Sequence, residues 1–502
     1  MKYIRLVKVS LCLLALGTSL RAAEFRDGKL WVEVLLASGT TLKIEPVGSA
    51  KVNMQVSEVD SPIQANLSGT LQIQVRNPDP LLYWGLLEGS LPWEDQSEGV
   101  LREVFAWEDS MLVIRRETLI YAPDSFPDRD EALEFALAAG YPEESVQSIP
   151  LLNSTVMIRA QNGTEHYYET PLRLHSDSPV YIGGVKLEFK GEFILKTVNG
   201  KIVLNHFLPL EDYIAGVIQH EIGSNAPLEA LKAQAVAART HAVSLLLYNR
   251  HVSDGYDLCN TTHCQVYKGT YLQTDDVRKA VLETQSEILL TSGRVADATY
   301  HSSCGGKTDA SSNIWNGLPQ PYLMGVTCIA SAENFDLTLE DSARRWIDTP
   351  VPTQGMSSWE KNSVFWSTRI TRQALAKNLG LSYVNRIVIN KRGVSGRITD
   401  MSFYGSGTVR LTSEYKIRQA FGGLRSSLFY IRQVYSADTS GNITIYPQDT
   451  LILVGKGSGH GVGMCQVGTL QRARNGSSYR EILSHYYPGT WLSDNWTDYG
   501  EK

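Results

Sequence analysis

The sequence predicts an α+β protein in which a β-rich N-terminal part precedes a mixed region that carries a helical hairpin. Residues 24–120 contain short alternating or apolar runs between Gly, Pro, Asn and Asp, a pattern typical of strands. Between Leu210 and Leu245 the apolar residues recur at helical spacing instead. The composition, 43% hydrophobic and 20% charged, is that of an ordinary globular protein, and 502 residues exceed the usual size of one domain.

The first 23 residues are predicted to be a secretory signal peptide. The basic residues Lys2, Arg5 and Lys8 precede an apolar run over residues 9–20, which is too short to span a membrane comfortably. Retention as a short N-terminal anchor is the alternative, and no other stretch approaches a transmembrane length. We therefore expect an exported protein of the periplasm or cell envelope.

The chain is acidic, with a net charge of −6. Removal of residues 1–23 takes away four of the 47 basic residues and no acidic ones, which leaves 43 basic against 53 acidic residues and a net charge of −10. This balance gives no general attraction to nucleic acid, so we do not expect a nucleic-acid partner.

Two regions are predicted to follow the signal peptide. Residues 24–170 form a β-rich region with a helical insertion at 124–141, where the apolar spacing changes to that of a helix. Residues 171–495 begin with hairpins, and Asn199 and Gly200 give a two-residue turn signal between two of their strands. Further strands and a helix at 372–379 are expected before a Gly-rich strand and a closing helix near 478–486.

The first helix of the predicted hairpin places a carboxyl group on an apolar face. From Leu210 onward, apolar residues at helical spacing form a stripe that Glu221 continues. Burial on that stripe and the negative end of the helix dipole both favour the protonated carboxyl group. A carboxyl group that stays protonated near neutral pH can serve as a general acid. The alternative is a Glu that marks the helix end and turns to solvent.

The residues after Glu221 predict a turn into a second helix. Gly223 fits the C-terminal end of the first helix, and Ser224 or Asn225 fits the N-cap of the next. Pro227 fits the first turn of that second helix. Glu221 is therefore expected at the elbow of an αα-hairpin.

The hairpin segment resembles a known family. DYIAGVIQHEIGSNAPLEALKAQAVAARTHAV is similar to the signature of the SpoIID (stage II sporulation protein D) family, which is also called the LytB or amidase-enhancer family. Further blocks that resemble the family are DLCNTTHCQVYKGT, ATYHSSCGGKTDASSNIW, PYLMGVTC and GHGVGMCQVGTLQRARNGSSYREILSHYYPGTWL. The chain departs from the family pattern modestly, with Ile-Gly after His220-Glu221 where relatives often have Met-Pro, and Cys465 where a Ser is common.

The resemblance implies a peptidoglycan lytic transglycosylase that acts on glycan strands stripped of their peptides, with Glu221 as its catalytic acid. Because some relatives enhance a separate cell-wall amidase, a non-catalytic peptidoglycan-binding regulator of an amidase is the alternative. The other residues expected around Glu221 or the glycan are Arg239, Gln265, Ser302, Gly305, His460 and Gln466. The candidate aromatic residues for stacking on sugars are Tyr267, Trp315, Tyr322, Tyr486 and Tyr487, and a place in the core is the alternative for each of them.

Glycine recurs at every second position from Gly455 to Gly463. In an extended strand these glycines share one face, which leaves a bare backbone strip that another backbone or a sugar ring can approach. The order of residues matches neither a phosphate-binding loop nor a dinucleotide fingerprint. The alternative is a tightly packed structural strand with His460 as a hydrogen-bonded core residue.

Five cysteines remain after the predicted signal peptide, an odd number for an oxidising compartment. The arrangements Cys259-x-x-x-His263-Cys264 and His301-x-x-Cys304 suit a zinc site by ligand type, although neither has a standard spacing. A disulfide within the set is the alternative. We expect no required cofactor, and a structural zinc stays open. A cysteine hydrolase is disfavoured, because a nucleophile and its base are seldom three residues apart.

Overall fold

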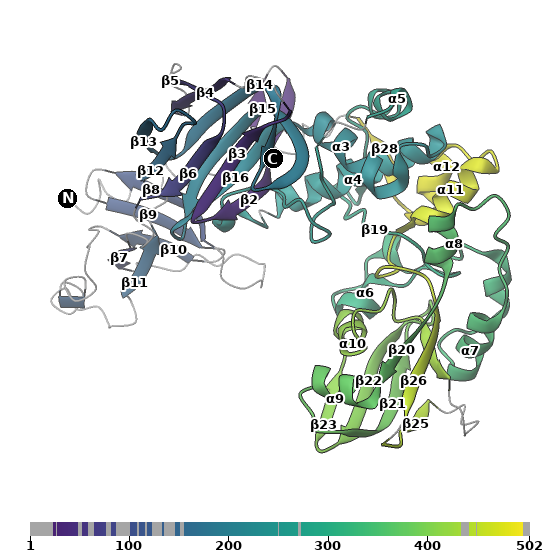
Figure 1. Ribbon diagram of the computed structural model, residues 1–502. Coiled ribbons are helices and arrows are strands. Elements are labelled where there is room, and N and C mark those ends of the chain that lie inside the picture. The colour runs from purple at the N-terminus through teal and green to yellow at the C-terminus, as the bar shows by residue number, and fades with distance from the viewer. Residues whose placement is uncertain are drawn as a thin grey trace, which may run out of the picture. The chain divides into compact units, whose positions relative to one another are not determined.

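A computed structural model describes the fold of the chain in two compact units (Figure 1). The first comprises Met1–Glu221, Ala242–Gln273 and Thr497–Lys502, and the second comprises Ile222–His241 and Thr274–Trp496. The described residues are 24–26, 28–48, 53–58, 65–76, 82–86, 101–107, 110–115, 118–122, 133–134, 146–150, 155–248, 250–269, 273–432, 441–447 and 449–494. The predicted signal peptide at 1–23 and nearly all of the predicted helix at 124–141 lie outside them.

An antiparallel sheet of 11 strands dominates the first unit. Its main path runs β1-β2-β16-β15-β14-β3-β6-β12-β13, and β4 and β5 branch from β14. The strands are β1 (Glu24–Arg26), β2 (Lys29–Gly39), β3 (Thr41–Pro46), β4 (Asn53–Glu58), β5 (Ala65–Ser68), β6 (Leu71–Val75), β12 (Thr155–Arg159), β13 (Glu165–Glu169), β14 (Leu172–Ile182), β15 (Val185–Val198) and β16 (Lys201–Pro209). The predicted strands therefore form, and the sheet takes strands from both sides of residue 170, where the sequence suggests a boundary.

Two smaller sheets contain the other described strands of the first unit. β7 (Leu82–Leu86) pairs with β11 (Val146–Pro150), and β8 (Leu101–Trp107), β9 (Ser110–Arg115) and β10 (Thr118–Ala122) form a meander. In the main sheet, β15 and β16 meet at the predicted turn, where Asn199 and Gly200 both have positive φ angles, 50° and 67°. This is the backbone that a tight two-residue hairpin needs.

β16 leads directly into α3 (Leu210–Ile218), which continues as a single π-helical turn, η2 (Gln219–Gly223). After a short turn comes α4 (Leu228–Leu247). Both predicted helices are therefore present, with two corrections. The helical segment ends at Gly223, as predicted, but its last turn, from Gln219, is a π turn rather than an α turn. The carbonyl of Pro227 accepts the first hydrogen bonds of α4, from Ala230 and Leu231, so Pro227 caps the helix in place of Ser224 or Asn225.

The second unit combines small sheets with short helices around two main cores. β20 (Phe365–Thr371), β26 (Thr450–Lys456) and β24 (Phe429–Arg432) form one sheet, and β23 (Thr408–Leu411), β22 (Ile398–Gly405), β21 (Val384–Arg392) and β25 (Asn442–Thr444) form another. Their apolar side chains pack with α9 (Arg372–Asn378) and α10 (Glu414–Ala420). The helix predicted at 372–379 is thus confirmed.

The other core of this unit joins the helices near the C-terminal end of the fold to short strands. It contains side chains of α4, α11 (Gln466–Arg474) and α12 (Tyr479–Tyr486), and of β17 (Ile288–Thr291) and β27 (Met464–Cys465). β17 also pairs with β18 (Arg294–Val295) and β28 (Trp491–Ser493), and β19 (Tyr300–His301) pairs with β27. The remaining helices include α5 (Asp275–Glu283), α6 (Ser311–Trp315), α7 (Glu340–Asp348) and α8 (Ser358–Val364). The predicted closing helix near 478–486 is confirmed as α12.

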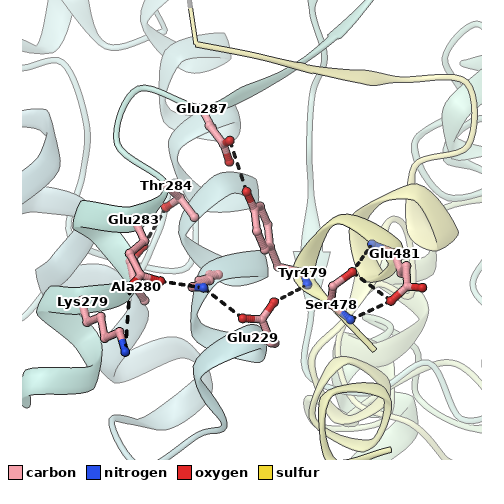
Figure 2. Close-up of polar contacts among 10 residues, drawn as sticks. Glu229, Lys279, Ala280, Glu283, Thr284, Glu287, Ser478, Tyr479 and Glu481 are labelled. Atoms are coloured by element: carbon pink, nitrogen blue, oxygen red, sulfur yellow. Dashed lines mark hydrogen bonds and ion pairs between the residues drawn. The ribbon is translucent and has the colours of Figure 1, made fainter. Parts of the chain in front are cut away.

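Polar contacts hold α4 against α5 and α12 (Figure 2). Nζ of Lys232 lies 3.0 Å from a carboxylate oxygen of Glu229 and 2.7 Å from one of Glu283. The other carboxylate oxygen of Glu229 accepts a 2.8 Å hydrogen bond from the amide of Tyr479. The Tyr479 hydroxyl donates to Glu287 at 3.2 Å. These contacts fix the N-terminal part of α4, the helix that follows Glu221 in the chain.

The predicted glycine-rich strand after Lys456 is wrong in its conformation. β26 ends at Lys456, and Gly457, Gly459, Gly461 and Gly463 all have positive φ angles between 70° and 92°, which L-residues with side chains rarely adopt. The prediction of a close backbone approach is confirmed, because a Cβ atom on Gly463 would lie 2.0 Å from the carbonyl oxygen of Thr299. The backbone of Thr299 therefore lies against this strip, as the alternative of a tightly packed structural segment predicts.

Candidate active site and metal centres

Glu221 lies in the π turn that ends α3. Ile218 and Ile222 on either side of it are buried, and Glu221 itself is half-buried. A π turn holds more residues than an α turn, so it shifts the direction of the side chains that follow. The carboxylate is therefore displaced from the centre of the apolar stripe on which the sequence predicts it. One oxygen, Oε1, accepts a 3.0 Å hydrogen bond from the amide of Val266.

The loop that supplies this amide packs closely on α3. A Cβ atom on Gly216 would lie 2.5 Å from the ring of Tyr267, so the ring lies against the bare backbone of the helix at that point. The side-chain amide of Gln219 donates a 2.7 Å hydrogen bond to the carbonyl of Gly269. The contacts of Tyr267 and Gly269 with α3 thus lie close to the hydrogen bond between Val266 and Glu221. They fix the loop against the helix that positions the carboxylate.

Tyr267 anchors the same loop in the core of the first unit. Its side chain is 1% exposed, and its hydroxyl donates a 2.7 Å hydrogen bond to Nδ1 of His206 on β16. Nε2 of His206 donates to the carbonyl of Lys190 at 3.0 Å. Burial lowers the pKa of His206 to about 4, so its ring is neutral near pH 7. The Tyr267 ring therefore has no exposed face to offer a sugar.

The cysteine and histidine pattern of this loop forms a cluster with a residue that the sequence reasoning missed. One ligand-type atom of each of His251, Cys259, His263 and Cys264 lies within 4.8 Å of the others. Two thiols and two imidazoles are a standard ligand set for structural zinc. His251 lies eight residues before Cys259 and outside any standard motif, so sequence spacing gave no signal for it.

The surroundings of this cluster fit a metal. Nδ1 of His251 lies 2.8 Å from a carboxylate oxygen of Asp254, while Nε2 lies 3.2 Å from Sγ of Cys264. A carboxylate behind the imidazole is the usual outer partner of a metal-binding histidine. The interaction between the two thiols lowers the pKa of Cys259 and raises that of Cys264.

The second predicted pair, His301 and Cys304, belongs to the second unit and joins a different residue, Cys465. These three residues also place ligand-type atoms within 4.8 Å of one another, and all three are buried. The predicted set of five cysteine and histidine residues is therefore divided between two clusters. All five cysteines of the described part of the chain are free, so the structure contains no disulfide among them.

The other residues predicted to contact the glycan differ in exposure. Ser302 is half-buried, Gly305 has a φ of 77° and accepts from Trp346, and Gln466 is buried and donates to Gln234 at 3.4 Å. Arg239 is fully buried and donates to the carbonyl of Glu287, and Gln265 is also buried. Of the predicted aromatic residues, Tyr322, Tyr486 and Tyr487 are buried, whereas Trp315 is 48% exposed.

His460 lies beside that exposed tryptophan. The two ring centroids are 5.1 Å apart. Both nitrogens of His460 are engaged with the backbone, Nε2 with the carbonyl of Tyr300 at 2.9 Å and Nδ1 with the amide of Val462 at 3.1 Å. The hydrogen-bonded alternative for His460 therefore describes its side chain in this structure.

These features define an α+β protein with a half-buried carboxylate at the end of a helix and a Cys2His2 cluster in the loop that binds it. Comparisons with known proteins place it in a family. The family model for stage II sporulation protein, SpoIID, matches residues 198–290, and a model for a domain of unknown function matches residues 309–463.

Individual relatives agree with the family model. An uncharacterised protein of Brachyspira hyodysenteriae is 30% identical over 71% of this chain and 87% of its own length. The stage II sporulation protein D of Bacillus amyloliquefaciens is 30% identical over 57% of this chain and 75% of its own length. The amidase enhancer of Bacillus subtilis is 30% identical over 70% of this chain but only 48% of its own length. The chain belongs to the SpoIID family, as the sequence motifs predict.

No helix in the described part of the chain has both the length and the apolar character needed to cross a membrane.

Proposed function

We propose that this protein is a peptidoglycan lytic transglycosylase, exported to the periplasm or cell envelope, with Glu221 as its catalytic acid and base. The observation that carries the proposal is the place of Glu221, half-buried in a π turn and bound by the Val266 amide. π turns occur frequently at functional sites. Membership of the SpoIID family supports an action on the cell wall.

The reaction needs one carboxyl group. Glu221 donates its proton to the oxygen between N-acetylmuramic acid and N-acetylglucosamine as the bond from that oxygen to the muramyl C1 breaks. The carboxylate then removes the proton of the muramyl 6-hydroxyl as its oxygen bonds to C1, which closes a 1,6-anhydro ring and restores the acid. Because the nucleophile belongs to the substrate, the second carboxylate of an ordinary glycosidase is not required. The Val266 amide holds Glu221 in one orientation for both proton transfers.

We also propose that zinc binds His251, Cys259, His263 and Cys264 and serves structure rather than chemistry. When bound, the ion supplies a cross-link between residue 251 and residues 259–264. This part of the chain continues into Val266 and Tyr267, which contact Glu221 and α3 respectively. The zinc cluster would thus stabilise the loop that orients the carboxylate.

The test is product analysis on peptide-free glycan strands with the wild type and Glu221→Gln side by side. Anhydromuramyl products from the wild type alone support the proposal. Reducing-end products instead indicate hydrolysis and contradict it. Glu221→Gln should keep its thermal midpoint near that of the wild type, because an amide oxygen still accepts from Val266.

A second function, enhancement of a cell-wall amidase without catalysis, is favoured by the similarity to the amidase enhancer of Bacillus subtilis. In that case neither the wild type nor Glu221→Gln yields products, both bind glycan strands, and both raise the rate of an added cell-wall amidase equally. The same pair of proteins therefore separates the two functions.

A further inference from the structure

The second unit contains three cysteines that are distant in sequence and adjacent in space. Cys304 and Cys465 are each 1% exposed, and the amide of Cys304 donates to Sγ of Cys465 at 3.2 Å. Cys328 interacts with both other thiols, but its sulfur lies outside the set of three ligand-type atoms that are all within 4.8 Å of one another. A Cβ atom on Gly468 would lie 2.3 Å from Sγ of Cys328, so glycine makes room for this third sulfur beside the first turn of α11.

His301 completes the cluster. Its Nδ1 donates to the carbonyl of Val462 at 3.0 Å, because a carbonyl oxygen can only accept. This bond fixes the tautomer and leaves a lone pair on Nε2. Nε2 is buried, and it has no hydrogen-bond partner of normal geometry among the described residues. The His301 ring nitrogen and the sulfurs of Cys304 and Cys465 lie within 4.8 Å of one another. An imidazole oriented by a backbone carbonyl, with its other nitrogen bare, is the arrangement of a metal-binding histidine.

The hydrogen-bond donors around the cluster point at the sulfurs. Sγ of Cys304 accepts from the amide of Gly306 at 3.3 Å, and Sγ of Cys465 accepts from Gly468 at 3.3 Å as the N-cap of α11. Tyr486 places its hydroxyl 3.0 Å from Sγ of Cys328. Each of the three sulfurs therefore has a donor directed at it or within reach. Binding of a cation here would displace the thiol protons, because three neighbouring thiolates in a buried site need a cation to balance their charge.

We propose that His301, Cys304 and Cys465 bind a second zinc ion, separate from the cluster that contains Cys259, and that the nearby Cys328 supplies the fourth ligand of a Cys3His site. Cys3His is a standard ligand set for structural zinc. A catalytic Cys–His pair is excluded by access, since Cys465 and His301 are 1% and 4% exposed and no substrate carbon can reach the sulfur.

The position of the ligands in the chain assigns the site a role. The segment 309–463, which matches the domain of unknown function, begins after Cys304 and ends before Cys465. β19 and β27 lie at the two ends of this segment and pair in parallel, with His301 opposite Cys465. Zinc bound there joins the start of the segment to its end, and Cys328 adds a third attachment from within it. The ion would therefore cross-link the two ends of the 309–463 segment.

The first experiment measures the metal content of the full chain, purified under reducing conditions and loaded with Zn²⁺. The wild type should hold about two zinc ions per chain, one for each cluster. A variant with His251→Ala and Cys259→Ser should retain about one. Adding Cys328→Ser to that variant should remove most of the remaining zinc. His460→Gln is the matched control, since its ring neighbours His301 but both its nitrogens bind the backbone, and it should keep both ions.

X-ray absorption of the His251→Ala/Cys259→Ser variant identifies the ligands without removing any of them. The proposed site gives three sulfurs at about 2.3 Å and one nitrogen at about 2.0–2.1 Å from zinc. If the variants do not fold, X-ray absorption of the wild type with both sites loaded tests the proposal instead. The ligands averaged over its two zinc ions should contain more sulfur than nitrogen. About one zinc per chain in the wild type, or a disulfide between any two of the three cysteines in non-reducing peptide mapping, overturns the proposal. None of these readouts depends on glycan cleavage.

Discussion

The amide of Val266 donates a 3.0 Å hydrogen bond to Oε1 of Glu221, and Val266 lies two residues after Cys264 of the Cys2His2 cluster. The proposed catalytic carboxylate is thus tied to a loop that offers a full zinc ligand set. A change that loosens this loop should therefore also change the orientation of the Glu221 carboxylate.

Replacement of Val266 by proline removes the amide hydrogen that binds Glu221. We expect kcat for glycan cleavage to fall by at least about tenfold while KM changes little, because a misplaced proton donor slows the chemical step more than binding. Val266→Ala keeps the amide and should retain most of the activity. Steady-state kinetics of both variants, with thermal midpoints measured beside them, test this. Equal kcat values in the two variants would show that Val266 does not position the carboxylate.

Loss of zinc from the Cys2His2 cluster should reduce activity through the same loop. Cys259→Ser removes one of the four ligands, and we expect the zinc content to fall by about one ion per chain. We also expect faster amide exchange in residues 259–269, because the cross-link no longer holds the loop. Hydrogen exchange followed by mass spectrometry measures the second effect. Unchanged exchange in a zinc-depleted variant would contradict a structural role for the ion.

Gly216 should tolerate no side chain. Alanine normally stabilises a helix interior relative to glycine by about 1 kcal/mol. At this position, however, the added Cβ would lie 2.5 Å from the Tyr267 ring and 3.0 Å from the Gly269 carbonyl oxygen. We expect Gly216→Ala to lower the free energy of unfolding by about 1–3 kcal/mol. Gly317→Ala, where a Cβ meets no atom within 4 Å and φ is not positive, is the control and should have little effect. Chemical denaturation of both variants gives the comparison.

Local patterns predicted much of this fold, and long-range contacts explain what they missed. The Asn199-Gly200 turn and the apolar stripe of α3 are encoded by neighbouring residues, so they could be read directly. The π turn could not, because Ile218 and Ile222 are four apart and fit an α-helix equally well. In the same way, alternating glycines fit both an extended strip and the series of positive φ angles that the chain adopts.

The candidate metal residues show the same limit. Cys259, His263 and Cys264 are close in sequence, and their pattern suggested a site. His251 joins them through a short intervening turn that no motif marks. Cys465 meets His301 through the parallel pairing of β19 with β27 across more than 160 residues of sequence, a contact that depends on the tertiary fold. The residue types in the sequence therefore indicated metal binding, but the tertiary fold determines which of these residues lie together.

His206 should make the stability of the first unit fall in mild acid. Burial lowers its pKa from 6.5 to about 4, so between these values the unfolded chain binds a proton that the folded chain does not. The free energy of unfolding should therefore decrease as pH falls from 6.5 to 4, by about 3 kcal/mol in total for this group. In His206→Gln, which keeps one donor and one acceptor for Lys190 and Tyr267, that part of the slope should disappear. Urea denaturation of both proteins at several pH values between 4 and 7 measures it. Parallel curves would show that His206 titrates alike in the folded and unfolded chain.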